Sequence, residues 1–259
     1  MIVYEDKTSF VMTEQHEHAL LSEGFAQHWK QEQFLGIDKR DSVLYAIAQH
    51  DRAWIDVDES PLWNDEAQVP FTFVDFPISL KLNFYKKGID EIEEENLYAA
   101  LLCSIHYTQF FNELTNDKRI ILFVNKELSR QKRLLNALNL YETDKNLVFH
   151  YNLLKFCDNI SLFVCMQEPG ANGDKVHNWF KNGLTQPFSF FKEFTFHAVW
   201  KSEKEIMVNP FPFTEEFKLS IPLRHVTKDL VKKLGILKAF QHSPIENRTV
   251  KIISKLALK

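Results

Sequence analysis

Apolar residues recur every three or four positions over much of the chain, the spacing that places them on one face of an α-helix. Around residues 40–53, for example, Val43, Ala46, Ile47 and Trp54 fall on one stripe. The same spacing along the chain predicts six helices, over residues 14–30, 40–53, 77–90, 97–115, 118–139 and 144–166.

Towards the C-terminus this pattern gives way to strict alternation, which is typical of strands with one buried face. The segment 217–223 alternates in this way, and a second run follows at Val250, Ile252, Leu256 and Leu258. Together with the aromatic segment 190–200, these runs predict a small antiparallel sheet with one short helix near 227–234. Two short apolar runs, 2–4 and 9–12, predict an N-terminal arm that could add a strand to it.

The expected fold is therefore mainly α. Residues 1–186 are predicted to form a helical bundle, and residues 187–259 a small C-terminal antiparallel β appendage packed on it. A chain of 259 residues is long enough for a substantial core arranged as one large domain or two.

Polar residues interrupt the apolar stripes of four predicted helices. His50 and Asp51 continue the stripe of the second helix, where a buried carboxylate costs several kcal/mol unless it is paired or bound to a metal. Three other helices carry one such residue each, at His18, His106 and Asp158. Imidazole and carboxylate groups meeting inside a bundle suit a divalent transition metal such as Zn, Fe, Mn, Co or Ni.

The order His18…His50-Asp51…Asp158 resembles the H…HD…D signature of the HD-domain superfamily of metal-dependent phosphohydrolases. The strings QHEHALLSEGFAQHW, HDRAWIDVDESP, LLCSIHYT and CDNISLFVC also resemble one bacterial family of unknown function within it. The resemblance implies an HD-type helical bundle and a metal held by these four residues. It also implies hydrolysis of a phosphate ester of a nucleotide or small metabolite.

Further polar residues near this signature are candidates for catalysis or for the pocket. Asp58 is predicted to act as the acid for the leaving oxygen or to position water, with Asp56 beside it, although both could be solvated loop carboxylates. His106 could bind a second metal, hold a phosphate oxygen or only hydrogen-bond within the core. Trp54 is predicted as a pocket wall, and Gln15 could orient a ligand or cap its helix.

Composition limits the function further. A net charge of −4 argues against a general nucleic-acid binder. The sequence shows no signal peptide and no apolar run long enough for a membrane span, so the cytoplasm is the expected compartment. Two functions stay open, a phosphohydrolase with a small phosphorylated substrate, or a non-catalytic metal-stabilised binding or sensor module. The oligomeric state is not specified by the sequence.

Overall fold

The computed structural model describes residues 1–111, 115–188, 190–191 and 194–255. Residues 112–114 of the predicted helix 97–115, residues 192–193 of the aromatic segment, and Leu256 and Leu258 of the last alternating run lie outside the described residues. Among the described residues, no helix is long and apolar enough to cross a membrane.

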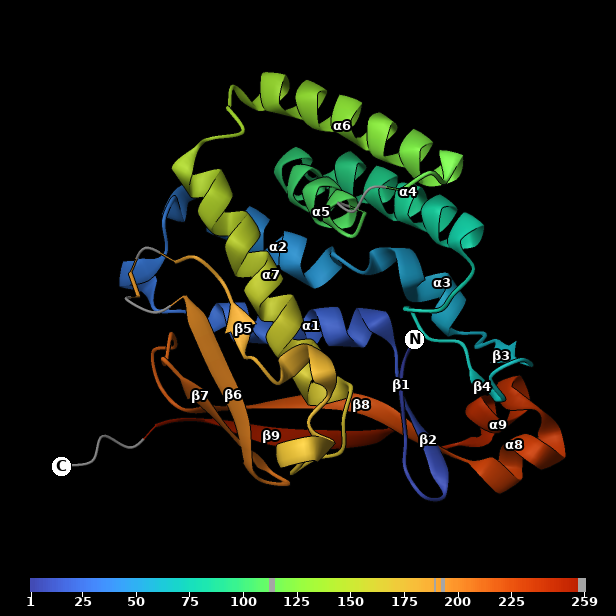
Figure 1. Cartoon of the computed structure of the whole chain (residues 1–259). Helices are drawn as coiled ribbons and strands as arrows, with labels where there is room; N and C mark the ends of the chain where they lie inside the picture. Colours follow the sequence, from blue (N-terminus) through green and yellow to red (C-terminus); the bar gives the residue numbers. More distant parts are fainter. Residues whose placement is uncertain (112–114, 189, 192–193, 256–259) are drawn as a thin grey trace.

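A curled seven-stranded sheet forms one end of the molecule (Figure 1). Its order is β1-β2-β8-β9-β7-β6-β5, and every pair is antiparallel except β7 with β9. The strands are β1 (Ile2–Glu5), β2 (Ser9–Thr13), β5 (Leu184–Thr185), β6 (Thr195–Ser202), β7 (Glu205–Asn209), β8 (Phe217–Thr227) and β9 (Glu246–Ser254). The short helices α8 (Lys228–Leu234) and α9 (Ile236–His242) join β8 to β9.

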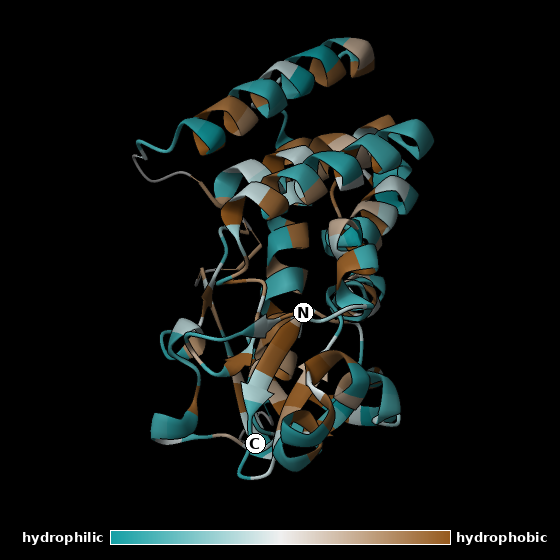
Figure 2. Cartoon of the chain, turned by 90° about the vertical axis from the view of Figure 1, so that its right-hand side faces the viewer, coloured by the Kyte–Doolittle hydropathy of each residue, from teal (hydrophilic) through white to brown (hydrophobic). Residues whose placement is uncertain are grey.

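Six longer helices in the described part of the chain pack together, and the first and last of them contact the sheet. The six helices are α1 (Gln15–Gln27), α2 (Arg40–Gln49), α4 (Ile78–Glu95), α5 (Leu97–Gln109), α6 (Lys118–Leu138) and α7 (Lys145–Cys165). Helix α1 contacts β8 on one side and α2 and α7 on the other. Helix α6, largely hydrophilic, lies at the end of the molecule opposite the sheet in both views (Figures 1 and 2). Helix α1 thus connects the sheet to the helical layers.

Shorter elements fill the connections. After α2 come η3 (Arg52–Trp54), α3 (Ile55–Asp58) and a small hairpin of β3 (Trp63–Asn64) and β4 (Val69–Pro70). The 3-10 turns are η1 (Gln31–Gln33), η2 (Ile37–Lys39), η4 (Gly173–Lys175) and η5 (Asn178–Phe180).

Side-chain caps fix where three of the helices begin. Asn96 accepts the Ala99 N–H at the start of α5, and Asp117 accepts the Arg119 N–H at the start of α6. Asp144 accepts the N–H groups of Asn146 and Leu147 and begins α7 in the same way. These caps set the register of α5 and α7, which carry His106 and Asp158.

The prediction of a mainly α fold with a small C-terminal β appendage is wrong. The chain is 52% helical, but its seven-stranded mixed sheet makes it an α/β fold and not an HD-type helical bundle. Strand β5 lies outside the predicted β region 187–259, and the N-terminal arm adds two strands, β1 and β2, to the sheet through the pairing of β2 with β8. Alternation identifies a strand locally, but its partners are set by contacts between segments far apart in the sequence.

Gly88 allows α4 to approach η3 very closely. A Cβ at this position would lie 2.8 Å from the backbone N of Ala53, which cannot move aside as a side-chain end can. Gly24 in α1 is a matched case, because a Cβ there would meet only the end of the flexible Leu219 side chain, at 2.7 Å. Gly88 is therefore needed for packing beside the His50-Asp51 segment.

We expect Gly88→Ala to lower the free energy of unfolding by about 1–3 kcal/mol, the usual cost of overpacking. Gly24→Ala is the control and should cost less, because Leu219 can change rotamer and alanine favours the helix. Denaturant unfolding of both variants measures the difference. Equal stability of the two variants would contradict a rigid contact between α4 and η3.

Candidate metal centre

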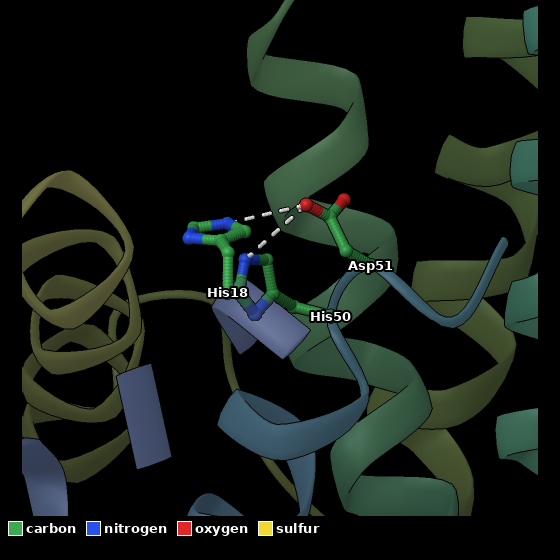
Figure 3. A group of neighbouring side chains, drawn as sticks. All are labelled: His18, His50 and Asp51. Carbon is green, nitrogen blue, oxygen red and sulfur yellow. Dashed lines mark ion pairs between the residues drawn. The ribbon is translucent and has the colours of Figure 1, made fainter. Parts of the chain in front are cut away.

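The end of α2 explains how His50 and Asp51, which are adjacent in the sequence, place their side chains on the same side. Successive residues of a regular helix project about 100° apart, so His50 and Asp51 would point in different directions if α2 continued through them. Helix α2 ends at Gln49, and Asp51 leaves the helical conformation with φ −109° and ψ 20° before η3 begins. Both side chains are consequently buried on the same side, facing His18 of α1 (Figure 3).

The imidazoles of His18 and His50 each direct a ring nitrogen without a hydrogen-bond partner in the described part of the chain into the space between the helices. His50 Nδ1 donates to the carbonyl of Ile47 at 2.7 Å, so in the neutral ring Nε2 carries a lone pair. His18 Nδ1 bonds to the Ser161 hydroxyl, whose own proton goes to the Asp158 carbonyl at 3.1 Å. Both Nε2 atoms are buried and lack a hydrogen-bond partner among the described residues. Buried polar atoms are rarely left so, which indicates a missing ligand.

Two carboxylates surround these nitrogens. Asp51 Oδ2 lies 3.3 Å from His18 Nε2 and 3.7 Å from His50 Nε2 (Figure 3). Asp158 Oδ1, from α7, lies 3.3 Å and 3.5 Å from the same two atoms. Each of the two carboxylate oxygens therefore lies within 4 Å of both nitrogens.

His106 of α5 extends the cluster on one side. Its Nε2 lies 3.6 Å from Asp158 Oδ2, the carboxylate oxygen other than the one that faces His18 and His50. The five residues form two overlapping groups, His18–His50–Asp51 and His50–His106–Asp158, within each of which the ligand atoms lie within 4.8 Å of one another. These buried groups could hold a metal ion.

The carboxylates and the burial act on the imidazoles in opposite directions. Burial alone would lower the pKa of His50, but the carboxylates of Asp51 and Asp158 outweigh it and raise this pKa to about 9. Burial dominates at His106 and lowers its pKa to about 4, despite the nearby Asp158. Burial would raise the pKa of Asp158, but the neighbouring imidazoles of His18 and His50 outweigh burial and lower it. Without a cation, the cluster thus retains two carboxylates and a protonated His50.

Neighbouring side chains hold the cluster in place. Gln15 Nε2 donates to Asp51 Oδ2 at 3.0 Å, which fixes the orientation of that carboxylate. Ser161 bonds to His18, and Ser22 lies 2.7 Å from Ser161. Metal ligands in proteins are commonly oriented by such outer contacts.

The cluster lies at one wall of a cavity of about 370 Å³. All cluster residues except His50 line it. The other lining side chains are mainly apolar or aromatic and come from distant segments: Gln15, Trp54, Phe73, Val74, Lys81, Tyr85, Phe110, Phe111, Asn159, Leu162 and Trp179. This volume is in the range of small-molecule sites.

The structure places the two remaining predicted site residues elsewhere. Asp58 is buried, but its Oδ1 accepts from the Met1 amino group and its Oδ2 from the Gln15 N–H at 2.6 Å. Burial raises the pKa of Asp58, and the Met1 amino group opposes this effect. Asp56 is exposed and pairs with Lys87. Neither residue lines the cavity, whereas the predicted pocket residues Gln15 and Trp54 do. The catalytic role of Asp58 stays a prediction.

Several residues of the site were missed from the sequence. Ser161 falls on the same helical stripe as Asp158, three residues later, so its place beside the cluster could have been inferred. Lys81, Phe73 and Trp179 could not, because segments far apart in the sequence bring them to the cavity.

Comparison with known proteins gives one match. Among curated proteins and among solved structures nothing matches. One family model, described as a protein of unknown function (DUF3891), matches residues 1–228.

This match corrects the resemblance to the HD-domain superfamily. The matching family is one of unknown function, and the curled seven-stranded sheet with its helices is not evidently an HD domain. The short H…HD…D order was misleading because it records only residue types at a few positions, whereas the family model spans most of the chain. The chain belongs to the DUF3891 family of proteins of unknown function.

Proposed function

We propose that this protein is a metal-dependent phosphohydrolase that cleaves a phosphate ester of a nucleotide or small metabolite. One observation carries the proposal: two buried imidazole nitrogens without partners in the described structure lie within 4 Å of two carboxylate oxygens, beside a ligand-sized cavity. The proposal follows from the chemistry of these residues and from no relative of the chain.

Charge supports a divalent ion. Asp51 and Asp158 together carry two negative charges in a buried environment, where uncompensated charge is costly. A divalent cation balances both charges while every imidazole stays neutral, the form in which histidine binds metals. Protonation of His50 alone would balance only one of the two negative charges.

Distances support the same conclusion. Four atoms around an ion in tetrahedral geometry with bonds of about 2.1 Å lie about 3.4 Å from one another. The observed separations between the two imidazole nitrogens and the carboxylate oxygens are 3.3, 3.3, 3.5 and 3.7 Å. His50 has a single free nitrogen, so it can bind only one ion. Zn, Fe, Mn, Co and Ni all accept such ligands.

In catalysis, the ion would supply the nucleophile and side chains of the cavity would bind the phosphate. A divalent ion in such a site lowers the pKa of a bound water towards neutrality and so supplies a nucleophile. Lys81 Nζ donates to the carbonyls of Phe73 (2.8 Å) and Val74 (3.2 Å), which leaves its third proton for an anionic oxygen. His106 lines the cavity in its neutral form and can contact the phosphoryl group.

One observation favours the alternative of a non-catalytic, metal-stabilised ligand-binding or sensor module. All five cluster side chains are buried, as in structural sites that leave no position open to water. The two functions differ in turnover and not in metal content, so only a substrate assay separates them.

We expect purified untagged protein to contain about one transition-metal ion per chain, measured by elemental analysis. His50→Ala and Asp158→Ala should lose most of it, because each removes a ligand and leaves buried charge unbalanced. His197→Ala, which removes an exposed histidine of β6, is the matched control and should keep the metal. Equal metal content in all three variants would contradict the proposed site.

Metal uptake should release protons in a pH-dependent manner. His50, with a pKa of about 9 against an ordinary 6.5, holds a proton at about pH 7.5 in the metal-free protein and must lose it to bind. We expect about one proton released per ion at about pH 7.5 and almost none well above pH 9, with affinity rising between the two. Calorimetry in buffers of different ionisation enthalpy measures this release. A heat of binding independent of buffer would contradict it.

The same raised pKa predicts how the metal-free fold responds to pH. Because the folded pKa exceeds the unfolded one, the stabilising contribution of His50 is complete below pH 6.5 and is lost as pH rises through about 9. Excess metal should remove this loss, which thermal melts with and without the ion would detect.

Hydrolysis is tested with a panel of phosphate mono- and diesters on protein loaded with Mn, Co, Ni, Fe or Zn. We expect His106→Asn to keep the metal but lose about 10²-fold or more in kcat, since it removes a group facing the substrate. Asp58→Asn should mainly lower the melting temperature, because this carboxylate anchors the Gln15 backbone. A kcat loss of about 10²–10⁴-fold in Asp58→Asn at unchanged stability would instead support its predicted acid role. No turnover of any ester at full metal loading would favour the sensor alternative.

A further inference from the structure

Aromatic side chains form a continuous wall leading away from the metal cluster. The Phe110 ring lies edge-to-face on His106 with centroids 4.7 Å apart, and Tyr85 follows at 6.2 Å from Phe110. Trp54 continues the wall, 6.0 Å from Tyr85. Phe73 and Trp179, 6.0 Å apart, also line the cavity. Such a wall favours a flat apolar group, which gains contact area without losing hydrogen bonds to water.

Charged groups are few in the same cavity. Among the described residues that line it, Lys81 is the one lysine, and no arginine is present. With the ion balanced by its two carboxylates, a single lysine suits one phosphate group. A polyphosphate chain would need more cations than these residues supply.

Two further atoms indicate that the inner cavity receives a ligand. Trp54 Nε1 and Gln15 Oε1 are buried without a hydrogen-bond partner among the described residues, and both residues line the cavity. The residues are only 1% and 2% exposed. They provide one donor and one acceptor close to the cluster, because Gln15 Nε2 is bonded to Asp51. The other uncharged polar side chains of the described lining are Asn159, Tyr85 and Trp179, too few to pair every hydroxyl of a polyhydroxylated substrate.

We infer that the substrate is a phosphate monoester whose alcohol carries a flat aromatic ring. The phosphate lies at the cluster and Lys81, and the ring lies against the aromatic side chains of the cavity, beside Phe110 and Trp179. This inference rests on the proposed function and specifies its substrate class.

The test compares phosphonates that cannot be hydrolysed, so it reports binding and not turnover. Calorimetry gives the Kd of methylphosphonate, 2-hydroxyethylphosphonate and benzylphosphonate for the metal-loaded full chain. We expect benzylphosphonate to bind about tenfold or more tightly than either of the others, because only it buries a ring.

Variants at the cavity mouth assign this preference to the aromatic wall. Trp179 and Phe110 are 52% and 51% exposed, so Trp179→Ala and Phe110→Ala are expected to fold. Each should reduce the preference for benzylphosphonate about two- to tenfold while leaving methylphosphonate binding unchanged. Lys81→Met should weaken both ligands alike. Tyr141→Ala, at a 79% exposed residue outside the cavity, is the control and should change nothing.

The outcomes distinguish a failure of the aromatic specificity from a failure of the proposed phosphohydrolase function. Equal binding of methyl- and benzylphosphonate, or tighter binding of the hydroxyethyl compound, would overturn the aromatic specificity and leave the phosphohydrolase proposal standing. Failure of every phosphonate to bind a protein that holds its metal would overturn both. A preference for benzylphosphonate that survives both mouth variants would also overturn the inference, because the ring would then lie elsewhere.

Discussion

Burial of two carboxylates among three imidazoles is the constraint on which the rest of the structure depends. Asp51 and Asp158 are almost fully removed from water, and their mutual repulsion is offset only by the groups that face them. Hydrogen bonds direct the Nε2 atoms of His18 and His50 towards these oxygens and leave them without other partners among the described residues. A divalent ion would balance both charges and use both lone pairs while the two imidazoles stay neutral.

The fold brings this cluster together from four helices spread over most of the chain. His18 lies on α1, which packs on the sheet, and Asp158 lies on α7, which packs on α1. His50 and Asp51 converge because α2 stops at that point, and Gly88 lets α4 pack against the turn that follows. The sheet therefore contributes no ligand to this cluster but supports the helix that carries the first one. The same packing leaves the aromatic cavity on one side of the cluster.

Local patterns and long-range contacts differ in how far they could be predicted. Polar residues on apolar stripes are visible in the amino-acid sequence, so all five cluster residues could be selected from their positions on those stripes. The mixed topology of the sheet could not be predicted, because the parallel pairing of β7 with β9 depends on contacts between segments far apart in the sequence. The burial of Asp58 could not be predicted either, because it depends on a hydrogen bond from the backbone N–H of Gln15, which lies far away in the sequence. Matching a short signature to a superfamily failed for a related reason, because such a signature contains none of these contacts.

The most direct test of the central claim is anomalous diffraction from crystals of the metal-loaded protein, recorded at the absorption edge of the ion. We expect a strong peak about 2.0–2.2 Å from four atoms, the Nε2 atoms of His18 and His50 and one carboxylate oxygen each of Asp51 and Asp158. No peak between these residues, with the ion found only at surface positions, would contradict the claim.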